Sequence, residues 1–306
     1  MKTLRYLAWA TDLVAFGTIM LGSWTRINGA GLTCPDWPLC QGRVMPPMAN
    51  GTVFEFAHRV FAISIAPLVA GLLVAAWRRR ARSPFIMPTM VAIGLFFFVQ
   101  ILLGAATVRL GNSPISVVLH WGTAMAFVAS VSAMGIFAAA NDAVEAGRSD
   151  ARTAVAIAGV LAGTSIIAFL TMCVGAYVSS SGAGLACLSI PGCAGNVVVY
   201  TQGQAVQMLH RIAAGGTLVC AAGSLAFAFA RPASARVRAA VCAGVALVCV
   251  QVLLGLLNVA LRLPTDLREA HAINAALVFL SFVVATTFAM LDARIFSASQ
   301  AEAARA

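Results

Sequence analysis

Residues 22–42 read GSWTRINGAGLTCPDWPLCQG, and residues 175–195 read GAYVSSSGAGLACLSIPGCAG. At a constant offset of 153 residues the two segments share identical residues that include, in the first segment, Gly22, Gly29, Ala30, Gly31, Leu32, Cys34, Cys40 and Gly42. A segment near the start of the chain therefore has a counterpart in mid-chain, which indicates an internal duplication.

The correspondence continues beyond these segments. Residues 56–60 (FAHRV) match 208–212 (MLHRI), residues 99–104 (VQILLG) match 250–255 (VQVLLG), and His120 matches His271. We therefore predict one four-helix unit repeated in tandem, with both copies running in the same direction and related by an axis along the membrane normal. The predicted halves are residues 1–145 and 146–306.

The composition places the chain in a membrane. Of its 306 residues, 61% are apolar and 10% are charged, whereas a soluble domain carries about 25% charged residues. This excludes a soluble enzyme and a disordered chain. Apolar runs long enough to span a bilayer occur at residues 7–27, 53–77, 86–110, 115–140, 153–179, 204–230, 237–261 and 267–291. The predicted fold class is an all-α integral membrane protein, with eight transmembrane helices as a duplicated four-helix bundle.

The net charge of +10 reports topology rather than nucleic-acid binding. Of the 20 basic residues, 13 lie before the first run or after the even-numbered runs, namely Lys2, Arg5, Arg78, Arg79, Arg80, Arg82, Arg148, Arg152, Arg231, Arg236, Arg238, Arg294 and Arg305. The positive-inside rule then places both termini in the cytoplasm. The first run is expected to be a retained span rather than a cleaved signal peptide, because it has a mid-chain counterpart, and Asp12 within it is expected to be an interfacial charge.

The four histidines of the chain occupy equivalent places. His58, His120, His210 and His271 each lie about four to six residues inside an even-numbered run, roughly 6–9 Å below the outer helix ends. Ionisable residues within spans usually mark a functional site. Each half offers two histidines and no nearby third ligand of the kind that zinc requires, whereas a pair of imidazoles between helices suits haem iron. We therefore predict a metal site of haem iron between the histidines of each half.

Residues beside the histidines have two open interpretations each. Arg59 and Arg211 are candidates for pairing with haem propionates, or they extend to the membrane interface. Cys34 and Cys40, and Cys187 and Cys193, fall in outer loops of an oxidising compartment. Two disulfides, Cys34–Cys40 and Cys187–Cys193, are therefore expected there, with either a structural or a redox role.

The two halves differ one turn before the first histidine. Glu55 precedes His58 by three residues, and Gln207 takes the same place before His210. A carboxylate beside a metal site can act as a base or stabilise positive charge, although it can also simply cap the helix start. The asymmetry suggests that one site performs chemistry and that the other handles electrons. Gln100 and Gln251 are expected to hydrogen-bond between helices rather than to belong to a site.

Taken together, these patterns resemble the haem A synthase family over essentially the whole chain. The segments that support the resemblance most strongly are GAGLTCPDWPLC at residues 29–40 and EFAHR at residues 55–59. The resemblance implies oxidation of the C8 methyl of haem O to a formyl group by hydroxylation steps, with water as the oxygen source. It assigns His58, His120 and the catalytic Glu55 to the substrate haem O, and His210 and His271 to a haem b that relays electrons. The family's usual acidic residue before the glutamate is replaced here by Phe54.

The same resemblance implies partners and a location. They are haem O synthase (a protohaem farnesyltransferase) as haem donor, a quinone or other membrane electron acceptor, a homo-oligomeric assembly, and a multi-pass position in the inner (plasma) membrane.

Two other classes of membrane protein are considered as alternatives. A quinone-linked dihaem cytochrome b also needs four histidines, but usually as one pair at each membrane side. A transporter built from repeats would show interrupted helices and polar groups at the midplane, of which this chain has few.

Overall fold

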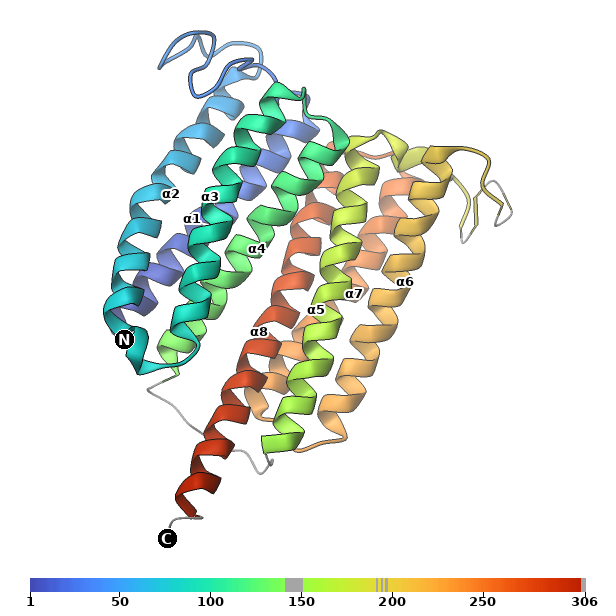
Figure 1. Ribbon diagram of the computed structural model, residues 1–306. Coiled ribbons are helices and arrows are strands. Elements are labelled where there is room, and N and C mark those ends of the chain that lie inside the picture. The colour runs from blue at the N-terminus through green and yellow to red at the C-terminus, as the bar shows by residue number, and fades with distance from the viewer. Residues whose placement is uncertain (141–150, 191, 194, 196–197, 304–306) are drawn as a thin grey trace.

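Eight helices that are long and apolar enough to cross a membrane dominate the computed structural model (Figure 1). The structure describes residues 1–140, 151–190, 192–193, 195 and 198–303, with side chains described as far as residue 293. The helices are α1 (Lys2–Ile27), α2 (Thr52–Arg79), α3 (Ile86–Arg109), α4 (Pro114–Ala139), α5 (Ala151–Ser180), α6 (Gln202–Phe229), α7 (Ala235–Ala260) and α8 (Thr265–Ala303). Short 3-10 turns, η1 (Arg80–Arg82) and η2 (Ala183–Leu185), follow α2 and α5. The eight predicted spans are confirmed, although α8 continues well past residue 291.

Local sequence explains where several helices begin. Proline occupies the first turn of α4, where its missing N–H costs nothing. The side chains of Thr201 and Ser234 accept the free backbone N–H groups of Gln204 and Val237 at the starts of α6 and α7. These polar caps stand at the ends of otherwise apolar helices.

The helices form two four-helix bundles. Helices α1 to α4 pack around one core that includes Leu4, Leu72 and Val128, and α5 to α8 pack around a second core that includes Leu161, Val241 and Phe282. In each bundle the even-numbered helices face each other across the centre, since each packs mainly against the odd-numbered ones. The predicted boundary between residues 145 and 146 lies outside the described residues.

The bundles meet through α4, α8 and the neighbouring faces of α1 and α5. Met125, Met172 and Phe279 form an apolar cluster at this junction, and the rings of Phe169 and Phe279 lie 5.4 Å apart. Helix α4 is the most deeply buried span, because it belongs to one bundle and also covers the other.

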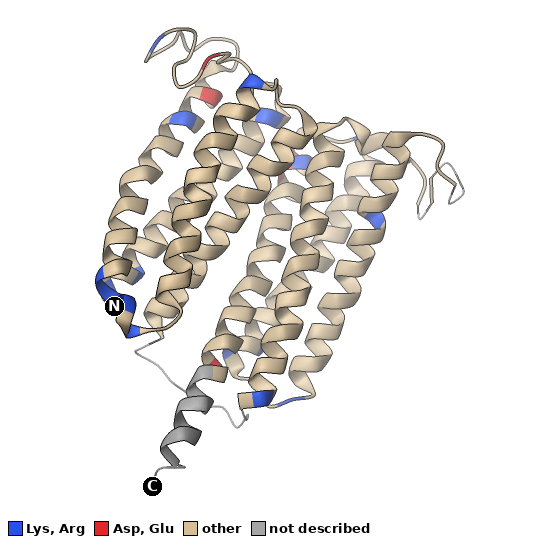
Figure 2. Cartoon of the chain, in the orientation of Figure 1, with Lys and Arg blue, Asp and Glu red and all other residues tan. Residues whose placement is uncertain are grey.

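The two ends of the molecule differ. Helices α1 and α5 start, and α8 finishes, at one end, which we call the terminal end, and the loop 28–51 lies at the other, which we call the loop end (Figure 1). The two bundles therefore run in the same direction, as the tandem repeat predicts. Basic residues gather at the terminal end around the last turn of α2 and the start of α7, with fewer at the loop end (Figure 2).

Asp12 corrects one expectation. Its carboxylate turns into the first bundle, where Ser132 of α4 donates a hydrogen bond of 2.7 Å to Oδ2, and Oδ1 is buried without a partner. An interfacial charge would instead be solvated. Sequence could not reveal this contact, because the two residues are 120 positions apart.

Candidate functional site

The four histidines all lie near the loop end, in the second or third turn of α2, α4, α6 and α8. Each side chain is half-buried and lies against a glycine of a neighbouring helix in its own bundle. His58 and His120 belong to the first bundle, and His210 and His271 belong to the second. The structure thus brings together the two pairs that the sequence predicts.

In the first bundle, His58 is fixed in orientation. Its Nδ1 lies 3.0 Å from the carbonyl oxygen of Thr18 in α1, so this nitrogen donates its proton and Nε2 remains free to act as a ligand. The ring lies against Gly22, where an added Cβ would come within 2.6 Å of His58 Cε1. Only glycine lets the ring approach α1 this closely. His120 on α4 is near enough for the two imidazoles to interact electrostatically.

The second bundle repeats this arrangement. The ring of His210 lies against Gly175, where an added Cβ would come within 2.8 Å of Cε1. The ring centres of His210 and His271 are 6.4 Å apart and the rings are nearly perpendicular. Two metal–nitrogen bonds of about 2 Å, with about 1 Å from each nitrogen to its ring centre, require a separation of about 6 Å. At this separation His210 and His271 would be able to hold one iron between them.

Unsatisfied ring nitrogens point to the same conclusion. Nδ1 of His120 and of His271 is buried and has no hydrogen-bond partner, while Nε2 of each ring faces a glutamine. Buried polar atoms without partners are rare and costly. The described residues contain no group of three or more histidine, cysteine, aspartate or glutamate side chains that could hold a metal. A two-ligand centre such as haem iron suits this donor set, and a structural zinc does not.

Two glutamines expected to serve only as helix contacts lie at the site. Gln100 Nε2 is 3.4 Å from His120 Nε2, and Gln251 Nε2 is 3.1 Å from His271 Nε2. Gln251 is oriented by Asn274, whose amide donates to its Oε1 at 2.7 Å. These glutamines do bridge helices as predicted, but each also contacts a histidine. Their identical offsets from the histidines in the two copies were the signal that could have found them.

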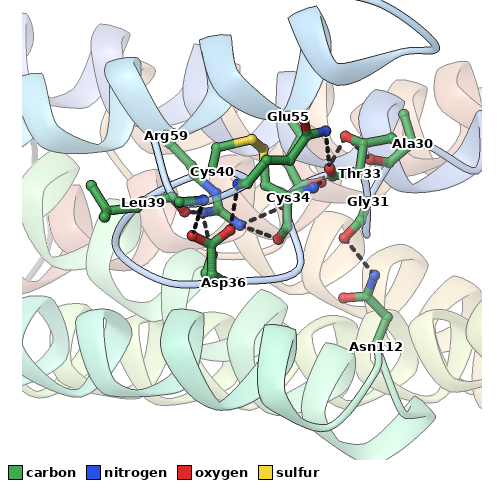
Figure 3. A network of polar contacts seen from close by, with 12 residues as sticks. Ala30, Gly31, Thr33, Cys34, Asp36, Leu39, Cys40, Glu55, Arg59 and Asn112 are labelled. Atoms are coloured by element: carbon green, nitrogen blue, oxygen red, sulfur yellow. Dashed lines mark hydrogen bonds and ion pairs between the residues drawn. A yellow bond between two sulfur atoms is a disulfide. The ribbon is translucent and has the colours of Figure 1, made fainter. Parts of the chain in front are cut away.

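Glu55 and Arg59 hold the loop that covers the first bundle (Figure 3). Glu55 Oε2 accepts hydrogen bonds from the backbone N–H of Cys34 at 2.8 Å and the hydroxyl of Thr33 at 3.0 Å, and Oε1 pairs with Arg59 at 2.7 Å. Arg59 also donates to the carbonyl oxygens of Cys34, Asp36 and Leu39. Four N–H groups of the guanidinium are thereby engaged by the loop and Glu55.

The second bundle has a matching loop with neutral partners. Gln207 Oε1 accepts the N–H of Cys187 at 2.6 Å, and its Nε2 donates to the carbonyl of Gly184 at 2.8 Å. Arg211 donates to the carbonyl oxygens of Cys187, Ser189 and Gly192. The structure thus places Arg59 and Arg211 under the loops, in contact with backbone carbonyls.

Both expected disulfides are present. Cys34 bonds to Cys40 and Cys187 bonds to Cys193, each across six residues and with a Cα–Cα distance of 4.5 Å. All four cysteines are buried. The disulfides close the loop segments whose carbonyl groups the two arginines bind.

Asp36 shapes the first loop on its exposed side. Its carboxylate accepts the backbone N–H groups of Gln41 and Gly42 at 2.6 and 2.8 Å. These hydrogen bonds, that of Gly42 first, hold the pKa of Asp36 below its ordinary value. In the second loop Ser189 takes the equivalent position and its hydroxyl accepts the N–H of Gly195.

Comparisons with known proteins agree with this architecture. The sequence model of a family described as cytochrome oxidase assembly protein matches residues 5–53 and 49–283. A heme A synthase of Shouchella clausii is 32% identical over 217 residues, which is 70% of this chain and 72% of that protein. The heme A synthase of Symbiobacterium thermophilum is 28% identical (70% of this chain, 72% of that protein), and that of Bacillus pumilus is 31% identical (69% and 70%).

Proposed function

The chain belongs to the haem A synthase family of cytochrome oxidase assembly proteins, and on that premise we propose that it oxidises the C8 methyl group of haem O to a formyl group. The observation that carries the proposal is the repeated histidine pair at the loop end, one pair in each bundle, with the 6.4 Å ring separation in the second. A chain that converts one haem with the help of another needs two such sites. A quinone-linked dihaem cytochrome would instead have its pairs at opposite ends.

We propose a division of labour between the bundles. The first, residues 1–145, would bind haem O between His58 and His120. The second, residues 146–306, would hold a haem b between His210 and His271, whose bound iron supplies one-electron transfer. Among the described residues, the clearest difference between the two sites is in the residues that anchor the loops, Glu55 and Gln207. The charged pair of Glu55 and Arg59 in the first bundle therefore supports assigning the chemistry to that bundle.

The overall conversion defines what the protein must handle. Methyl plus water gives formyl plus four protons and four electrons, so the site must admit water and release protons. Loss of two electrons and one proton from the methyl leaves a cationic carbon, which water traps to give the alcohol with release of a second proton. A second oxidation gives a geminal diol, which loses water to form the aldehyde.

Glu55 fits the role of a fixed negative charge better than that of a proton acceptor. Oε2 already accepts two hydrogen bonds and Oε1 faces a guanidinium. A carboxylate held in this way stabilises developing positive charge without having to reorient. Its burial, with the residue 4% exposed, strengthens that effect by excluding water.

The partners and membrane follow from the same proposal. Haem O is the product of a protohaem farnesyltransferase, which we propose as the donor, and a quinone or another membrane carrier would accept the electrons. The helices form a multi-pass membrane protein. We propose the inner (plasma) membrane, both termini in the cytoplasm, and a homo-oligomer as the assembly.

The test is to express the full chain in cells that make haem O but lack haem A synthase, in medium enriched in ¹⁸O water. The extracted haems are separated by chromatography, and their masses are measured by mass spectrometry. We expect haem A with ¹⁸O in its formyl group, and only haem O from a matched strain that carries His58→Ala. The formyl oxygen exchanges with water, so the alcohol intermediate is also collected, because its oxygen does not exchange.

Two outcomes would contradict the proposal. If no haem A formed although the haem-loaded protein was present in the membrane, the proposed oxidation of haem O would be refuted. An alcohol intermediate without ¹⁸O would show that water is not the source of its oxygen.

A further inference from the structure

A buried polar cluster joins the two bundles at the loop end. Ser23 of α1 donates a hydrogen bond of 2.8 Å to Glu269 Oε2 of α8, and the two residues are 4% and 6% exposed. Arg26 Nη2 of α1 donates to the hydroxyl of Ser179 of α5 at 3.2 Å. These contacts connect α1 of the first bundle with α8 and α5 of the second.

The cluster occurs once, although the chain is a duplication. Arg26 and Ser179 are equivalent positions of the two copies, at the same offset of 153 residues, so their contact lies close to the axis that relates the bundles. The positions equivalent to Ser23 and Glu269 are Ala176 and Val118. Because apolar residues occupy the equivalent positions, the duplication does not produce a second copy of this cluster. The cluster is specific to this junction.

The charges of the cluster do not cancel. The charges of Arg268 and Glu269 both act on the Arg26 guanidinium, so two cations share the surroundings of one carboxylate. Neither arginine has a carboxylate within 4.0 Å among the residues with described side chains. Both are half-buried, and like charges held together out of water favour an added anion.

Other basic residues at the loop end are less suited to an anion in the membrane. Arg59 and Arg211 donate to loop carbonyl groups. The remaining three, Arg43, Arg109 and Arg262, are exposed. Arg26 and Arg268 are thus the two half-buried arginines at the loop end, among the described residues, for which no hydrogen bond to a loop carbonyl is seen; Arg26 reaches across the junction to Ser179.

Both arginines lie one helical turn closer to the loop end than a residue of the histidine sites. Arg26 follows Gly22, the contact of His58, by four residues, and Arg268 precedes His271 by three. On a helix these spacings place each arginine on the same face as the site contact and about 5 Å closer to the loop end. A ligand held between the histidines would present its loop-end edge to these guanidinium groups.

We propose that Arg26 and Arg268 bind the propionate carboxylates of the two haems, Arg26 in the first bundle and Arg268 in the second. The inference rests on the proposed function and names residues that position the haems. Planar guanidinium groups match carboxylates by paired hydrogen bonds. Glu269 limits the excess positive charge, and its bond to Ser23 holds α8 against α1 so that the two arginines stay side by side.

The test uses the full chain produced in haem-deficient cells, held in detergent micelles and titrated with protohaem or with its dimethyl ester, in which both propionates are uncharged. Arg268→Gln is measured in a His58→Ala background and Arg26→Gln in a His210→Ala background, so that each reports one site. Arg262→Gln, on the exposed turn between α7 and α8, is the matched control.

Each arginine variant is expected to weaken protohaem binding about tenfold and to leave binding of the ester unchanged, whereas Arg262→Gln changes neither. As a second readout in haem-loaded protein, Arg268→Gln should make the reduction potential of the second-bundle haem more negative, because a positive charge near the iron is removed. Arg268→Lys should recover most of that potential.

Equal losses with protohaem and ester would mean that the arginines only support the fold, and no loss with either ligand would mean that the propionates bind elsewhere. Either result overturns the inference. Failure of the parent chain to bind any haem would instead refute the proposed function, so the two failures are distinguishable.

Discussion

The loop anchors of the two bundles perform the same structural task with different chemistry. Glu55 and Gln207 each accept the N–H group of the first loop cysteine, at 2.8 and 2.6 Å. Gln207 uses its second polar atom to donate to Gly184, whereas Glu55 pairs with Arg59. The second bundle shows that a neutral amide is sufficient to hold such a loop. The negative charge in the first bundle therefore needs another reason, and the proposed chemistry supplies one.

The largest predicted difference between the bundles concerns the histidines. His58→Ala is expected to lower haem A formation at least about 100-fold by displacing the substrate, yet to keep the absorbance of a haem in the second bundle. His210→Ala should remove that absorbance as well as the activity. Pigment extraction and visible spectra of the purified variants measure both effects.

His120→Ala and His271→Ala provide the controls, because each should behave like its partner in the same bundle. If His58→Ala removed the same spectral component as His210→Ala, the two sites would not be independent, and the assignment of one bundle to each haem would be wrong.

Sequence alone predicted the elements that depend on periodic or repeated residues. The eight spans follow from runs of apolar residues, and the two histidine pairs follow from their equal offsets within the duplication. The disulfides follow from two cysteine pairs in segments outside the spans. Each of these inferences uses residues that lie near one another in sequence or in register between the copies.

A second prediction compares the arginines beneath the loops. Arg59→Gln leaves Glu55 buried without its cation, and we expect the free energy of unfolding to fall by about 3 kcal/mol. Arg211→Gln removes hydrogen bonds to carbonyl groups beside the neutral Gln207, so it leaves no glutamate at that place unpaired and should cost less, about 1 kcal/mol. Unfolding in mixed micelles, followed by helical circular dichroism, gives both values.

The double variant Glu55→Gln/Arg59→Gln tests the reason for that difference. It should be more stable than Arg59→Gln alone, because the unpaired charge is gone. A double variant as unstable as Arg59→Gln, or equal losses for the two single arginine variants, would show that the ion pair does not distinguish the loops.

The smallest predicted difference is in acid sensitivity. Hydrogen bonds from the N–H groups of Gly42 and Gln41 lower the pKa of Asp36, so its contribution to loop order is present above the ordinary aspartate value of about 4 and is lost as the pH falls through the lowered pKa. Limited proteolysis with an acid-active protease should show the loop 28–51 opening in this range.

Asp36→Asn should remove this pH dependence. The loop of the second bundle, with Ser189 in the equivalent place, should not show it at all. Equal acid opening of both loops would assign the effect to another group.

The roles of several site residues could not be predicted, because they depend on how a loop folds back onto a helix. Arg59 lies next to His58, and the sequence left open whether it pairs with a propionate or extends to the interface; its contacts with carbonyl groups 20 to 25 residues away could not be foreseen. Helical periodicity gives the face on which such a side chain lies and says nothing of what covers that face. The contact of Ser23 with Glu269, across 246 residues, is beyond sequence reasoning for the same reason.

The central claim is that the first bundle needs the charge of Glu55 and not merely its hydrogen bonds. The most direct measurement is the ratio of haem A to haem O in extracts of Glu55→Gln, with Gln207→Glu as the matched exchange. Because glutamine already anchors the second loop, Glu55→Gln should fold and bind haem, yet form haem A at least about 100-fold more slowly, while Gln207→Glu stays active. Normal haem A formation by Glu55→Gln would contradict the account.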